Sequence, residues 1–115
     1  MDKRTIKLGN RKLEVEIATT PLEKMKGMSF REEGKMLFVF DKDVKDPLHM
    51  ATLSVPLQMI FFNSRKDIID IQRAEPWTMN PLTWKTYKPD TSYRFVLEST
   101  DFLDLEIGGS FEFID

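Results

Sequence analysis

The chain has 115 residues, a length that fits one domain with one hydrophobic core. Hydrophobic residues make up 41% and charged residues 31% of it, which is ordinary for a folded protein and argues against disorder. A net charge of -2 gives no general reason to expect nucleic acid or an anionic membrane as a partner. The absence of cysteine excludes disulfides, thiolate nucleophiles and thiolate metal sites.

Two further absences bear on the compartment. No apolar run approaches the ~20 residues that a membrane-spanning helix needs. The basic residues near the start are not followed by the apolar segment of a signal peptide. We therefore expect a cytoplasmic protein.

The first third of the chain predicts strands around one short helix. Residues 5–8 are expected to form a short strand, and the alternation of apolar and polar residues from Lys12 to Ala18 predicts a second. A continuous apolar run at residues 36–40 is too short for a helix and predicts a buried strand.

The helix is expected between the second and third of these strands. Thr20 can cap its N-terminus, with Glu23 completing a capping box. Gly27 is expected to end it, since glycine tolerates positive φ at a helix end. Leu22, Met25 and Met28 are the predicted buried stripe.

The predicted fold is organised around one hairpin in the middle third of the chain. Leu57–Phe62 is apolar on both faces, which predicts a central strand covered on each side. Residues 63–66 are turn material, and Asp67–Arg73 alternates, with Ile69 and Ile71 expected to point inward.

The remaining segments complete the fold prediction. Strands are expected at residues 48–50, 91–98 and 110–114, with a helical turn at 99–103, and a long loop without secondary structure at 74–89. About eight short strands with one or two short helices predict a mainly β protein, a compact antiparallel β-barrel or β-sandwich. Residues 1–115 are expected to form this single domain.

Four stretches together resemble the family called domain of unknown function 192. They are VEIATTPLEKMKGMSFR at 15–31, MLFVF at 36–40, HMATLSVPLQMIFFN at 49–63 and YRFVLE at 93–98. The resemblance covers most of residues 13–114. It implies a compact, mainly β barrel or sandwich, and it implies no activity.

The resemblance also marks positions where this chain departs from the family pattern. The family pattern implies an aromatic residue in place of His49, Lys and Asn in place of Ala51 and Thr52, and an acid in place of Gln58. If those positions hold a family ligand, His49, Thr52 and Gln58 are candidate ligand-binding residues that would hold it differently here.

The long loop carries the other candidate binding residues. Trp77, Trp84 and Tyr87 offer flat faces and hydrogen-bond donors, and Lys85 adds a cation beside them. Such surfaces suit saccharides, nucleobases or an extended peptide. The alternative is that both Trp side chains fold inward and cap an open end of the barrel. On the first interpretation, the site is a cleft between the Trp77–Tyr87 loop and the chain crossing at Leu48–Val55.

Catalytic and metal sites have less support. There is one His, no Cys and no serine in a G-x-S-x-G elbow, and the three acids of residues 41–46 lack the glycine and distal glutamate of a calcium loop. Acid–base chemistry needs two carboxylates held close together, and the sequence does not show which of its acids meet in space. The acids that could supply such a pair are Asp70, Glu98, Asp101 and Asp104.

The leading hypothesis is a non-catalytic binding module for an unknown small molecule, saccharide or peptide. The alternative is a small carbohydrate-directed or hydrolytic enzyme that uses His49 or a carboxylate pair, and a weaker alternative is single-stranded nucleic-acid binding by the barrel. We expect no cofactor, no metal, no nucleic acid and no membrane as a partner.

Overall fold

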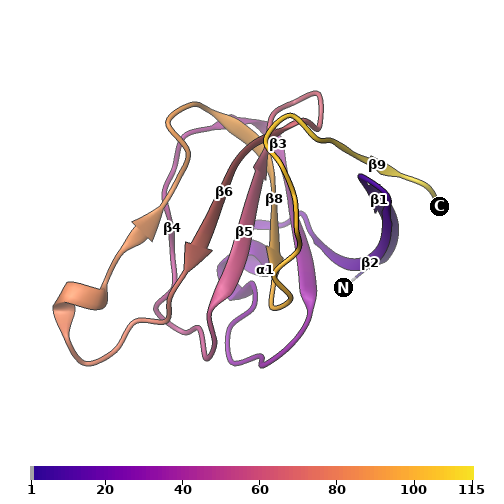
Figure 1. Ribbon diagram of the computed structural model, residues 1–115. Coiled ribbons are helices and arrows are strands. Elements are labelled where there is room, and N and C mark those ends of the chain that lie inside the picture. The colour runs from indigo at the N-terminus through magenta and orange to yellow at the C-terminus, as the bar shows by residue number, and fades with distance from the viewer. Residues whose placement is uncertain (1) are drawn as a thin grey trace.

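The computed structural model describes residues 2–115, which form nine strands, one α-helix and one short 3-10 helix (Figure 1). The prediction of a mainly β domain is confirmed. The elements in chain order are β1 Lys3–Leu8, β2 Arg11–Ala18, α1 Pro21–Lys26, β3 Lys35–Val44, β4 Leu48–His49, β5 Leu57–Phe62, β6 Ile68–Ala74, the 3-10 helix η1 Pro81–Thr83, β7 Thr86–Tyr87, β8 Tyr93–Ser99 and β9 Phe111–Phe113.

Seven of the strands form one curled sheet in the order β6-β5-β8-β3-β2-β1-β9, and β4 pairs with β7 in a separate ribbon. Neighbouring strands of the seven-stranded sheet are antiparallel, except β2 and β3. These two run parallel because α1 and the loop after it return the chain to the same end of the sheet. The two edges of the sheet meet at one point, where Asp67 of the β5–β6 turn bridges Ser110 just before β9. The sheet is therefore a half-barrel with its edges joined at one end.

The prediction of a central β5 is confirmed, because all six of its residues are buried between two core clusters. Ile60 and Phe62 belong to the cluster inside the curl, where Ile6 of β1 and Phe111 of β9 also pack. Met59 and Phe61 belong to the cluster on the outer face. That outer cluster is covered by the segments that build the site described below, including Met28, Met50 and Tyr87.

The prediction that Ile69 and Ile71 of β6 point to the same side of the sheet is wrong. Between Phe61 and Phe62 the partner residue in β6 shifts by two, which leaves Ile69 out of the register. A bulge of this kind turns the residues on either side of it to opposite faces. Ile69 consequently packs on the outer cluster and Ile71 on the inner one, although strict alternation predicts the same face for both.

The capping prediction for α1 is confirmed, and its predicted buried stripe is wrong for Leu22 and Met25 but correct for Met28. Thr20 and Glu23 form the capping box, and the helix ends before Gly27, whose φ is 46°. Leu22 is 76% and Met25 is 75% exposed, and no residue of this six-residue helix is buried. The apolar side chain that reaches the core is Met28, which comes two residues after the helix has ended.

The segment from Glu75 to Ser92 is more structured than the sequence predicts. It contains η1, capped by the Asn80 side chain, and the two residues of β7. In Figure 1 this orange segment extends away from the sheet before it returns to β8.

Residues 100–103 do not form the predicted helical turn. No helix within residues 2–115 is long and apolar enough to cross a membrane.

Candidate functional site

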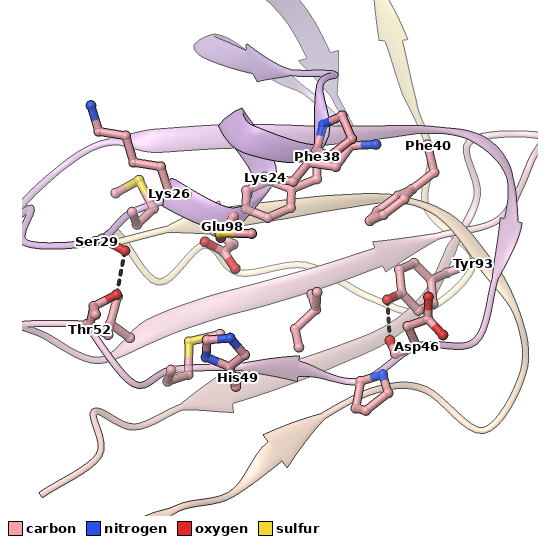
Figure 2. Close-up of a pocket in the computed structure, with 18 residues that line it drawn as sticks. Lys24, Lys26, Ser29, Phe38, Phe40, Asp46, His49, Thr52, Tyr93 and Glu98 are labelled. Atoms are coloured by element: carbon pink, nitrogen blue, oxygen red, sulfur yellow. Dashed lines mark hydrogen bonds between the residues drawn. The ribbon is translucent and has the colours of Figure 1, made fainter.

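A cavity of about 470 Å³ lies over the outer face of β3 and β8 (Figure 2). One wall is α1 with the residues just after it, and the opposite wall is the segment 46–53 around β4. The floor carries Phe38 and Phe40 from β3, and Tyr93 and Glu98 from β8. Half of the other fourteen lining residues have apolar side chains: Pro21, Met25, Met28, Pro47, Leu48, Met50 and Leu53.

Two hydrogen bonds join the walls and the floor at opposite ends of the cavity, as Figure 2 shows. At one end the hydroxyl groups of Ser29 and Thr52 share a hydrogen bond of 2.5 Å. At the other end the Tyr93 hydroxyl donates to the backbone carbonyl of Asp46 at 2.5 Å. Burial, and next the charge of Asp46, raise the pKa of Tyr93 to about 12, so it remains a donor at neutral pH. The first bond joins the two walls to each other, and the second joins the β4 wall to the floor.

Gly27 allows the α1 wall to approach the floor closely. A Cβ atom at this position would lie 3.0 Å from Cζ of Phe38 and 3.7 Å from Oε1 of Glu98. Any other residue would crowd the Phe38 ring, and the positive φ at this position would strain it further. The glycine predicted as a helix end therefore also shapes the cavity.

Glu98 is the chemically unusual residue of the site. Glu98 is only 4% exposed, and it lies opposite Met36 of β3 and Met59 of β5 in the sheet. Burial alone raises the pKa of Glu98 to about 8, with no hydrogen bond or nearby charge contributing. Within residues 2–115, none of the ion pairs involves Glu98. A neutral carboxyl group without a protein partner thus borders the cavity at neutral pH.

Two lysines of α1 line the same cavity. Nζ of Lys24 lies 4.1 Å from the centroid of the Phe40 ring, a cation–π contact. Burial lowers the pKa of Lys24, and the charge of Asp41 opposes that shift. Lys26 is exposed. Over the described part of the chain, neither lysine takes part in an ion pair.

The predicted site residues separate into three groups. His49 and Thr52 line the cavity. Gln58 lies elsewhere, where its amide donates to the carbonyl of Leu103 at 2.8 Å and accepts from the N–H of Leu103 at 2.8 Å. Gln58 thereby fixes the segment after β8 to β5.

The third group, on the long loop, does not line the cavity. Trp77 and Trp84 stack with ring centroids 5.7 Å apart, and Trp84 remains 51% exposed. Lys85 is exposed, whereas Tyr87 is buried and its hydroxyl accepts from the backbone N–H of Glu75. His49 connects this loop to the cavity, because its ring centroid lies 5.7 Å from that of Trp77.

Comparison with known proteins places the fold in a family. The model of the DUF192 family, whose description is "Uncharacterized ACR", matches residues 4–103. The chain belongs to the DUF192 family. The resemblance inferred from the four sequence stretches is confirmed, and the family description names no activity.

Individual relatives agree with this assignment. A "UPF0127 protein" of Thermococcus sibiricus (strain DSM 12597 / MM 739) is 24% identical over an alignment of 102 residues that covers 82% of this chain and 62% of the relative. The chain therefore spans less than two thirds of that relative's length. Among solved structures, a Sinorhizobium meliloti 1021 protein provisionally named a transcription regulator superposes with a TM-score of 0.84 at 23% identity, covering 97% of this chain and 94% of that one.

A second solved structure, a protein of unknown function from Novosphingobium aromaticivorans DSM 12444, has a TM-score of 0.75 at 21% identity and covers 96% of this chain and 83% of that one. At these identities the two structures show that the DUF192 fold is shared. They carry no function to this chain.

Sequence reasoning missed most of the cavity of this DUF192 domain. The sequence suggests Glu98 only as half of a carboxylate pair, and none of its candidate partners Asp70, Asp101 and Asp104 lines the cavity. Asp70 instead accepts from the Gln72 amide, and Asp101 pairs with Lys35. The signal that could have found Glu98 is an acid within the otherwise apolar end of the strand that begins at Tyr93.

Proposed function

We propose that this DUF192 domain is a non-catalytic binding module that takes a small molecule into the cavity between α1 and residues 46–53. The observation that carries the proposal is Glu98, a carboxyl group 4% exposed, bordering a cavity and without a protein partner. Over residues 2–115, no fully buried side-chain oxygen or nitrogen lacks a hydrogen-bond partner, so the carboxyl oxygens of Glu98 reach the open space of the cavity. A ligand in the cavity therefore meets a carboxyl group that is free to hydrogen bond to it.

The size and lining of the cavity support a small-molecule ligand. A volume of about 470 Å³ lies in the range typical of small-molecule pockets, which are mostly apolar with a few polar groups. Three methionines line it, Met25, Met28 and Met50, and their flexible thioether chains adapt to ligands of different shape. The fixed parts are the aromatic floor and the two hydrogen bonds at the ends.

Binding is favoured over catalysis because, within residues 2–115, no ion pair or neighbouring charge joins Glu98 to a second catalytic group. The alternative, a small hydrolytic enzyme, rests on the raised pKa of Glu98, which suits a general acid at neutral pH. Such an enzyme needs a base or nucleophile beside the acid. Turnover of chromogenic glycosides or esters that is lost in Glu98→Gln, without loss of folding, would favour the enzyme.

The aromatic loop is a second proposed surface, next to the mouth of the cavity. The exposed stack of Trp84 on Trp77, joined to the cavity through His49, supports binding of a saccharide or an extended peptide there. Trp77 donates from Nε1 to the carbonyl of Lys85, and Trp84 donates from Nε1 to the carbonyl of Thr78, so both rings are held in place. The sequence predicts a cleft between this loop and residues 48–55, and the surface proposed here is the exposed Trp77–Trp84 stack beside His49.

The experiment compares two substitutions on one helix. Met25 and Leu22 are almost equally exposed, at 75% and 76%, but only Met25 lines the cavity. A fluorinated fragment library is screened by ¹⁹F NMR against the wild type, Met25→Trp and Leu22→Trp. We expect cavity-binding fragments to lose affinity in Met25→Trp and to keep it in the matched Leu22→Trp control. An absence of hits that shift amides at the cavity, or equal loss in both variants, would contradict the proposal.

A further inference from the structure

We propose that the ligand of this cavity is a small organic anion with a flat apolar body and a hydrogen-bonding group at the end opposite its charge. This inference rests on the proposed function and adds the chemical class of the ligand. It follows from three features of the cavity: two lysines on the α1 wall, a carboxyl group on the floor, and aromatic rings that also line the floor.

The cations set the sign of the ligand's charge. Lys24 and Lys26 both line the α1 side of the cavity, and no carboxylate of residues 2–115 lies within ion-pair distance of either. Figure 2 shows the amine of Lys26 turned outward, so Lys24, whose Nζ lies over the Phe40 ring, is the cation nearer the floor. The acids nearby are Asp41, which influences Lys24, and Asp46, which lines the end of the cavity at Tyr93. Lysines without carboxylate partners attract and orient an anion, and their repulsion disfavours a cation.

The floor sets the chemistry at the other end of the ligand. Figure 2 shows Glu98 between the α1 side and His49, well inside the cavity. In its neutral form a carboxyl group offers one O–H donor together with acceptor capacity. That pattern complements a phenol, an amide or the edge of a heterocycle. A ligand with an ammonium group at this end would first have to ionise Glu98 in apolar surroundings.

The rings define the body of the ligand. Phe38, Phe40 and Tyr93 line the floor, and the Phe40 and Tyr93 rings meet edge to face at 5.6 Å. The Tyr93 ring is held in place by the hydrogen bond of its hydroxyl to Asp46. Fixed aromatic rings of this kind favour a flat partner over a branched one.

Two probes that differ in charge test the class directly. 4-Hydroxyphenylacetate and tyramine share a phenol and a two-carbon side chain but carry opposite charges. ¹H–¹⁵N spectra of the protein are recorded at pH 7 during titration with each probe. We expect 4-hydroxyphenylacetate to shift the amides of residues 24–29, 46–53 and 93–98, and tyramine to bind at least about tenfold more weakly. 4-Hydroxybenzylphosphonate, as a third probe, separates preference for a carboxylate from preference for a phosphate-like head.

Variants then assign each end of the probe. Lys24→Gln with Lys26→Gln is expected to weaken 4-hydroxyphenylacetate binding about tenfold, whereas Lys12→Gln, an exposed lysine of β2 outside the cavity, leaves it unchanged. Glu98→Gln keeps a donor and an acceptor, so it should weaken binding less than Glu98→Leu, which removes both. A circular dichroism melt of each variant separates loss of binding from loss of folding.

The inference is overturned if tyramine binds better than 4-hydroxyphenylacetate, or if neither probe binds. It is also overturned if the double lysine variant binds 4-hydroxyphenylacetate as well as the Lys12→Gln control does. In each of these cases the proposed function still stands if uncharged or cationic fragments occupy the cavity and are blocked by Met25→Trp. Failure of every fragment class would contradict both proposals.

Discussion

Replacing Glu98 with glutamine should change how stability depends on pH. Burial raises the pKa of Glu98 from 4.5 to about 8, so the folded protein holds the proton more tightly than the unfolded chain does. The resulting stabilisation is complete below pH 4.5 and is lost as the pH rises through about 8. Glutamine has a similar shape and does not titrate, so Glu98→Gln should lack this dependence.

The magnitude follows from the same shift. Over the interval in which only the unfolded chain is ionised at this position, the free energy of unfolding falls by about 1.4 kcal/mol per pH unit. Between pH 5 and pH 8 the wild type should therefore lose about 4 kcal/mol relative to Glu98→Gln. Carboxyl groups with a lowered pKa, such as Glu16 hydrogen bonded to Arg31, act in the opposite sense and only in acid, and both proteins share them.

Urea unfolding of both proteins at pH 5, 6, 7 and 8 provides the measurement. The difference in unfolding free energy, wild type minus Glu98→Gln, should decrease steadily over this range. Two parallel profiles would refute the reasoning, because they would mean that Glu98 ionises near its ordinary pKa. Glu98 would then be either solvated or paired, and the floor of the cavity would not be the apolar environment described above.

Three further predictions concern the core, the loop and the excluded partner. Phe61→Ala should cost ~3–5 kcal/mol of unfolding free energy, because Phe61 is 0% exposed in a strand covered on both faces; a loss below about 1 kcal/mol in denaturant titration would contradict that placement. Trp84→Ala should cost less than ~1 kcal/mol, since Trp84 is 51% exposed, and a loss of ~3–5 kcal/mol would show that it plugs the core. Single-stranded DNA or RNA should give no fluorescence-anisotropy change at physiological salt, and a rise that weakens steeply with added salt would overturn this.

The sequence predicted the strands well where the pattern was simple. Leu57–Phe62 is apolar on both faces, and only a strand between two core layers accommodates that pattern. The capping box at Thr20 is equally local, since the two hydrogen bonds join residues three apart. Such features depend on neighbours in the chain and can be predicted from it.

The errors arose where distant segments decide the outcome. The bulge at Ile69 results from the pairing between β5 and β6, and no residue type in the β6 sequence predicts it. Leu22 and Met25 have helical spacing, but the helix lies over a cavity and not over the core. The site itself joins α1, β4 and β8, which are far apart in sequence, so the cavity appears only when the chain has folded.

A crystal of the protein soaked with a fragment mixture tests the central claim most directly. The account predicts electron density for a fragment between α1 and residues 46–53, with a polar atom within hydrogen-bond distance of the Glu98 carboxyl group. Fragments found only on the Trp77–Trp84 stack, or a cavity filled by its own side chains with Glu98 paired inside the protein, would contradict it.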